Sequence, residues 1–137
     1  MEQKAISDTV GMADLYLATD IKLHSIYKSN ESIKSAKIES TSIDYYFKNY
    51  NKEVNFIKMD IEGAELRAMR EASSFLQKNK NIKIITEFNP ILIKRFGGEP
   101  EEYLDLLLKN GFQLYNINEQ EKNKIYQKFR VVQKISY

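Results

Sequence analysis

The stretch VNFIKMDIEGAE, residues 54–65, decides the fold, because an apolar run changes there into an acidic turn. Its first part, VNFIKMDI, is rich in β-forming residues and nearly continuously apolar, as expected for a buried strand covered on both faces. Gly63 permits a sharp turn, and AELRAMREASSFLQK, residues 64–78, then shows apolar residues at helical spacing. We therefore predict a strand, a turn and one helix.

A second strand and helix follow along the chain. NIKIITEF, residues 81–88, repeats the strand pattern. GEPEEYLDLLLKNG, residues 98–111, has Pro100 in its first turn, a leucine-rich apolar face and Gly111 as its stop. These two units predict a parallel pair of strands, each followed by a helix.

The segments on either side complete the fold class. FQLYNIN, residues 112–118, and KIYQKFRVVQKI, residues 124–135, read as two strands, most simply an antiparallel pair at one edge of the sheet. Upstream, residues 13–19 and 36–43 predict strands, and residues 44–51 predict a helix. The chain is therefore expected to be an α/β layered domain.

One polar segment interrupts the upstream strands. KSNESIKSAK, residues 28–37, is polar enough to predict an exposed loop or an insertion. Neither an internal repeat nor a Pro- or Ser-rich linker divides the 137 residues, so we expect one domain.

Composition excludes several classes of function. Twenty-one basic and 19 acidic residues leave a net charge of only +2, without a basic face, which disfavours nucleic-acid binding. The sequence has no cysteine and one histidine, so a disulfide framework and a zinc site are not expected. No apolar run approaches the ~18 residues of a membrane span, and no signal-peptide pattern opens the sequence, so we expect a cytoplasmic protein.

Three carboxylates surround the predicted turn. Asp60 ends a strand, and the carboxyl ends of parallel strands open into the crevice where α/β sheets bind ligands. Asp60 is therefore a candidate functional residue, because the strand before it is too apolar to be an exposed face. Glu62 and Glu65 lie near the start of the helix, where the dipole alone favours negative charge by ~0.3–1 kcal/mol each. A structural and a functional role stay open for both glutamates.

The segments NFIKMDIEGAE, IITEFNP and LLLKNGFQLYNIN closely resemble the FkbM-type family of S-adenosylmethionine-dependent methyltransferases. That family typically shows a strand ending in Lys-x-Asp-x-Glu-Gly-x-Glu, a helix, a strand ending near a glutamate, another helix, and a Gly-aromatic strand. The matching residues are Lys58, Asp60, Glu62, Gly63, Glu65, Glu87, Gly111 and Phe112. Upstream, KAISDTVGMADLYL resembles the end of the family's third strand and the turn into an added strand.

The resemblance implies a Rossmann-like class I methyltransferase sheet with strand order 3-2-1-4-5-7-6, of which this chain holds the C-terminal part only. It would contain the end of strand 3 and strands 4–7, with an antiparallel edge pair, so that residues 1–137 form a single partial domain. Residues 20–50 would be an insertion between strands 3 and 4. None of the five glycines forms the GxG turn that the cofactor's methionine end would approach, so we expect S-adenosylmethionine to bind this chain weakly or not at all.

The resemblance also implies roles for particular residues. Asp8 would accept a hydrogen bond from the adenine amino group, although an ordinary turn aspartate is an equal alternative. Asp60 would face both the cofactor and the acceptor hydroxyl, and it is the candidate catalytic residue.

The substrate side would be lined by polar residues of several segments. We expect it to include His24, Glu62, Glu65, Glu87 and Asn89. A surface histidine is the alternative for His24. Asn89 and Pro90 would shape the wall of the pocket, but Pro90 can equally be a helix-preventing loop residue. No required metal is predicted, because oxygen ligands of unknown geometry are weak evidence for one.

The implied activity is O-methylation of a hydroxyl on a sugar or polyketide-like small molecule, by a domain that is incomplete as given. The alternative is a non-catalytic remnant of the fold that serves as an oligomerising interaction module. The predicted strand at Val54–Met59 would be an apolar edge without a neighbouring strand, so we expect a homo-oligomer through this edge or pairing with a separate N-terminal half.

Overall fold

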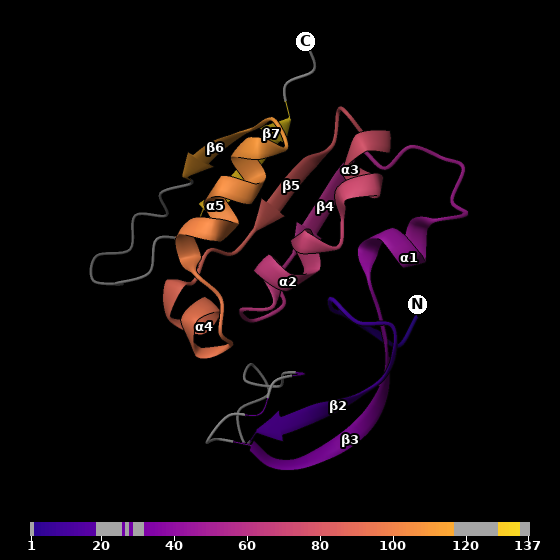
Figure 1. Ribbon diagram of the computed structural model, residues 1–137, viewed down its shortest axis with the longest axis vertical. Helices are drawn as coiled ribbons and strands as arrows, with labels where there is room; N and C mark the ends of the chain where they lie inside the picture. The colour runs from indigo at the N-terminus through magenta and orange to yellow at the C-terminus, as the bar shows by residue number, and fades with distance from the viewer. Residues whose placement is uncertain (1, 19–25, 27, 29–31, 117–128, 135–137) are drawn as a thin grey trace.

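The computed structural model describes residues 2–18, 26, 28, 32–116 and 129–134 as a mixed α/β fold with two sheets (Figure 1). The strands are β1 (Lys4–Ile6), β2 (Gly11–Ala18), β3 (Ser32–Thr41), β4 (Phe56–Met59), β5 (Lys83–Thr86), β6 (Phe112–Asn116) and β7 (Phe129–Lys134). The helices are α1 (Ile43–Phe47), α2 (Glu65–Arg70), α3 (Ser73–Lys78), α4 (Pro90–Arg95) and α5 (Pro100–Lys109). The predicted α/β class is confirmed.

The larger sheet has the order β4-β5-β7-β6. β4 and β5 are parallel, with Met59 opposite Thr86, as the two strand-and-helix units predict. β6 and β7 are antiparallel and lie at one end of the sheet, which confirms the predicted edge pair. The parts of the two predicted strands at residues 117–118, 124–128 and 135 lie outside the described residues. β4 forms the opposite end of the sheet.

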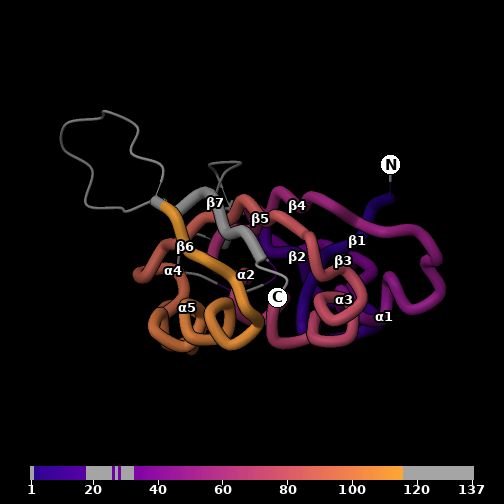
Figure 2. The backbone as a smooth tube through the Cα atoms, turned by 90° about the horizontal axis from the view of Figure 1, so that it is seen from above, coloured from indigo at the N-terminus to yellow at the C-terminus, as the bar shows by residue number. Residues whose placement is uncertain are grey.

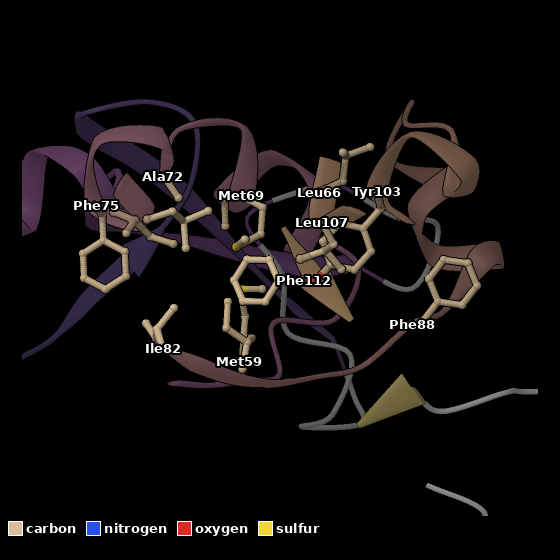
Figure 3. Close-up of a cluster of buried hydrophobic side chains, with 14 of the residues drawn as sticks. Met59, Leu66, Met69, Ala72, Phe75, Ile82, Phe88, Tyr103, Leu107 and Phe112 are labelled. Atoms are coloured by element: carbon tan, nitrogen blue, oxygen red, sulfur yellow. The ribbon is translucent and has the colours of Figure 1, made fainter. Parts of the chain in front are cut away.

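The hydrophobic core lies on one face of this sheet. Figure 2 shows α3 and α5 on the same side of the strands, and the buried side chains converge there from helices and strands (Figure 3). The buried residues of this core include Met59, Leu66, Met69, Phe75, Ile84, Tyr103, Leu107 and Phe112. One-sided cover is what allows the other face to carry polar residues.

The prediction that residues 54–61 are covered on both faces is wrong. Met59 is buried, but Phe56 is 53% exposed and Lys58 is exposed. The reason is that α3 and α5 cover only the face to which Ile57 and Met59 contribute. Side chains alternate along a strand, so Phe56 and Lys58 point to the other face.

The single helix predicted over residues 64–78 is divided into α2 and α3. Asp44 at the start of α1 causes the break: its N–H donates to the carbonyl of Glu71 at 3.0 Å. Its carboxylate accepts hydrogen bonds from the backbone N–H groups of Ser74 (3.0 Å) and Phe75 (2.7 Å). Asp44 thus caps α3 from another part of the chain, satisfying N–H groups that a helix start leaves unpaired.

The prediction that Pro90 prevents a helix is wrong, because Pro90 begins α4. The side chain of Asn89 accepts a hydrogen bond from Leu92 N–H at 3.2 Å, and Pro90 occupies the first helical turn, where its missing N–H costs nothing. By contrast, α5 begins at Pro100 and ends at Lys109, ahead of Gly111, as predicted.

The polar stretch at residues 28–37 was predicted to be an exposed loop or an insertion, but β3 begins within it at Ser32. β3 pairs antiparallel with β2 along its length, and Lys37 Nζ lies 3.0 Å from Asp14 Oδ1 across the pair. The backbone hydrogen bonds of this pairing stabilise a strand that composition alone disfavours. On its other side β3 pairs in parallel with β1, so β1 belongs to the smaller sheet, of order β1-β3-β2.

The region expected to be an insertion, residues 20–50, therefore contains β3 and α1 where it is described. Within the described part of the chain, no helix combines the length and the apolar character that crossing a membrane requires.

Candidate functional site

The turn after β4 has an unusual backbone that presents acidic side chains. Glu62 has φ +53° and Gly63 has φ +96°, and the turn closes with a hydrogen bond from Ala64 N–H to the Ile61 carbonyl at 3.2 Å. A left-handed conformation is uncommon for a residue with a side chain and costs of order 1 kcal/mol or more. Backbone strain of this kind is concentrated at functional sites, so the turn after β4 is a candidate functional site.

Three carboxylates meet at this edge of the sheet. Asp60, Glu62 and Glu87 each place an oxygen so that the three atoms lie within 4.8 Å of one another; Asp60 is exposed and the two glutamates are half-buried. Parallel pairing explains the meeting, because Met59 and Thr86 are partners and Asp60 and Glu87 follow them. Lys58 Nζ lies 3.6 Å from Asp60 Oδ2 and partly balances the charge. All three acids were predicted as candidates: Asp60 from its position at a strand end, Glu62 from its place at the start of the helix, and Glu87 from the family resemblance.

Glu65 lies beneath this cluster and not within it. Glu65 is only 1% exposed, and its Oε1 accepts a hydrogen bond from Ile61 N–H at 3.0 Å. Burial raises the pKa of Glu65, hydrogen bonds from backbone groups of the turn lower it, and the charge of Glu87 raises it further. This placement favours a role in bracing the turn over contact with a substrate.

The buried carboxyl group predicts a measurable dependence of stability on pH. Because the pKa of Glu65 is raised in the folded protein, the folded state binds this proton more tightly than the unfolded chain does. The resulting stabilisation is complete below about pH 4, the ordinary range of a glutamate, and is lost as the pH rises through the raised pKa. Glu65→Gln should remove this loss and keep an oxygen acceptor for Ile61 N–H.

We therefore expect the free energy of unfolding of Glu65→Gln, relative to wild type, to increase between about pH 4 and about pH 7.5. Urea unfolding at the two pH values measures it. The exposed Glu53→Gln serves as the control and should show no comparable increase. Glu65→Leu leaves the N–H without its acceptor and should cost about 1–3 kcal/mol at either pH. Equal pH dependence of wild type and Glu65→Gln would contradict the assignment.

A buried pair of hydroxyl groups, which the sequence pattern did not predict, includes Thr86, the residue before Glu87. Thr86 Oγ1 and Tyr103 Oη are 2.8 Å apart, and Tyr103 stacks on Phe88 with ring centroids 6.4 Å apart. Burial raises the pKa of Tyr103, the hydrogen bond with Thr86 lowers it, and the charge of Glu65 raises it. Tyr103 lies within the helix predicted over residues 98–111, but nothing in the local sequence shows that its hydroxyl finds a partner on β5.

Asp8 is tied to the same helix that follows the acidic turn. Its Oδ1 accepts a hydrogen bond from Ser7 Oγ at 3.0 Å, and its Oδ2 lies 3.7 Å from Arg67 Nη1. Arg67 also donates from Nη2 to the Phe96 carbonyl at 2.7 Å, at the end of α4. Arg67 on α2 thus links the residues after β1 to the end of α4, and no local sequence pattern predicted this link.

The remaining predicted site residues are placed differently. The side chain of Asn89 caps α4, so one of its polar atoms is already engaged. His24 lies outside the described residues. Contact of either with a substrate stays a prediction.

The comparison with known families identifies the class of protein. The sequence profile of the family described as Methyltransferase FkbM domain matches residues 3–114, a range that spans every element from β1 to α5 and includes the acid cluster. The chain belongs to the FkbM methyltransferase domain family. Searches of curated proteins and of solved structures gave no match.

Proposed function

We propose that this chain supplies the C-terminal part of a Rossmann-like, S-adenosylmethionine-dependent O-methyltransferase domain. The observation that carries the proposal is the cluster of Asp60, Glu62 and Glu87 at the carboxyl ends of two adjacent parallel strands. This is the edge of an α/β sheet at which ligands bind. The acceptor that we propose is a hydroxyl group of a sugar or polyketide-like small molecule.

The arrangement of the larger sheet supports the half-domain part of the proposal. The order β4-β5-β7-β6 corresponds to the 4-5-7-6 portion of the sheet expected for class I methyltransferases. Helices α3 and α5 cover one face, while Phe56 and Lys58 on the other face are exposed. In such a domain, strand 1 would pair with β4.

The residues present fit the cofactor in part. Asp8 and Asp60 offer carboxylate oxygens, which suit the amino and hydroxyl groups of S-adenosylmethionine. Asp8 already binds Ser7 Oγ and Arg67, which orients its carboxylate. Gly63 and Gly97 both have positive φ values, but Gly63 packs against Leu92 and Phe96, and Gly97 lies near Arg67. Neither glycine belongs to a GxG turn of the kind that the methionine end of the cofactor would approach.

When bound, S-adenosylmethionine would supply a methyl group that is already activated by its sulfonium. The protein then has to position the acceptor oxygen and remove its proton. Asp60 is the residue for both tasks, because its exposed carboxylate can accept the hydroxyl proton directly. Glu62 and Glu87 would orient other hydroxyls of a polyol acceptor, and Glu65 holds the turn beneath them.

The half-domain part predicts that S-adenosylmethionine binds the isolated chain with a Kd weaker than about 1 mM, or not at all. Calorimetric titration into the folded 137-residue chain measures this affinity. Micromolar binding would contradict the half-domain part, because the chain would then hold the whole cofactor site.

The methyl-transfer part is tested separately. The chain can be joined to the N-terminal half of an FkbM-type domain, and release of S-adenosylhomocysteine can be followed with sugar and polyketide alcohols. Turnover that depends on the acceptor is expected. A folded fusion that binds the cofactor and turns over none of these acceptors would contradict the proposed acceptor class.

A further inference from the structure

The free edge of β4 offers main-chain hydrogen-bonding groups. Among the described residues, β4 pairs only with β5. The carbonyls of Asn55 and Met59 accept hydrogen bonds from Lys83 N–H (2.9 Å) and Glu87 N–H (3.4 Å), so alternate residues of β4 face β5. The N–H and C=O groups of Phe56 and Lys58 therefore point to the other side.

The usual protections of an edge strand are weak here. β4 has no proline and pairs with β5 without a register shift, so no bulge twists it away. Phe56 is 53% exposed at this edge, and Lys58 supplies the single charge within the strand. An exposed, regular edge with an aromatic residue is a template for pairing with another strand.

We propose that a second copy of this chain pairs antiparallel with β4, with a two-fold axis at Ile57. In this register Phe56 lies opposite Lys58 of the second copy, and each such pair exchanges two hydrogen bonds. The ammonium group of Lys58 then lies beside the ring of the partner's Phe56, an attractive arrangement. The neighbouring register, which places Lys58 opposite itself, brings like charges together and is disfavoured.

The axis runs perpendicular to the sheet, so the helices of both copies lie on the same face. On that face, Ile57 of one copy contacts Ile57 of the other, and within each copy Ile57 packs against the core. The pairing uses only β4 and its side chains, so it needs neither methyl transfer nor a bound cofactor. In the complete domain proposed above, strand 1 would occupy this edge of β4 instead, so the pairing applies to the chain without an N-terminal half.

Light scattering after size exclusion at micromolar concentration should show a dimer of the wild-type chain. Lys58→Pro removes an N–H that β5 does not use, and Phe56→Lys places two lysines opposite each other; both should weaken association at least ~10-fold. The matched control is Tyr115→Lys, which changes an exposed aromatic residue on β6 and should leave the dimer intact. A monomeric wild type, or dissociation by Tyr115→Lys alone, would overturn the proposal.

A cross-linking experiment tests the register. The chain has no cysteine, so an introduced one reports only its own contacts. Ile57→Cys should form an intermolecular disulfide under mild oxidation, because this position faces itself across the axis. Lys58→Cys should cross-link far less. The reverse result would overturn the register, and circular dichroism of each variant verifies the fold.

Discussion

Gly63→Ala is expected to lower the free energy of unfolding by about 2–5 kcal/mol. Gly63 has φ +96°, and a Cβ atom there would lie 2.7 Å from Leu92 Cβ and 2.9 Å from Phe96 Cδ2. The left-handed backbone contributes ~1–2 kcal/mol to this cost, and overpacking against α4 contributes ~1–3 kcal/mol. Urea unfolding at neutral pH measures the difference.

Gly97→Ala is the matched control for this prediction. Gly97 also has a positive φ, +76°, but its nearest neighbour to an added Cβ is Arg67 Nη2 at 3.9 Å. It should therefore show only the backbone cost of ~1–2 kcal/mol. If the two variants lose the same stability, the close packing of the acidic turn against α4 does not contribute.

Asp60→Asn is expected to reduce turnover of the complete methyltransferase by at least ~100-fold, if Asp60 accepts the proton of the acceptor hydroxyl. The substitution is nearly isosteric and lies at an exposed position, so the fold and much of the cofactor affinity should be retained. An amide cannot take the proton. Release of S-adenosylhomocysteine by the fusion enzyme, together with a calorimetric titration, separates turnover from binding.

Asp105→Asn removes an exposed carboxylate from α5 and controls for the change in net charge. It should leave turnover within about twofold of wild type, in contrast to Asp60→Asn. Undiminished turnover of Asp60→Asn would show that Asp60 is not the base. Glu87, the neighbouring acid of the cluster, would then be the next residue to test.

Much of the candidate site could be predicted because its signals are local. Asp60 and Glu87 each follow an apolar run, and parallel strands place such residues at a common edge. The requirement for glycine at the turn was also visible, and Gly63 has the positive φ that it implies. The boundaries of α5 follow from Pro100 and Gly111 in the same way.

The burial of Glu65 could not be predicted, since a glutamate at a helix start is ordinarily solvated there. Its 1% exposure depends on the packing of α2 beneath the turn, and on Ile61 N–H being free to bind it. The same applies to Tyr103, whose hydroxyl partner Thr86 lies on another element. Both are pairings between groups that the local pattern does not relate.

Local sequence patterns specify the α/β class, the strand-turn-helix unit around residues 54–65 and the gathering of acids at strand ends. Tertiary contacts are needed to place the break in the helix over residues 64–78, the start of β3 at Ser32 and, among the described residues, the exposed face of β4. The physical reason is the separation along the chain between the residues that interact. Periodicity and turn preferences act over a few residues, whereas the cap that divides α2 from α3 comes from Asp44, 30 residues before Ser74, and β3 is stabilised by its pairing with β2.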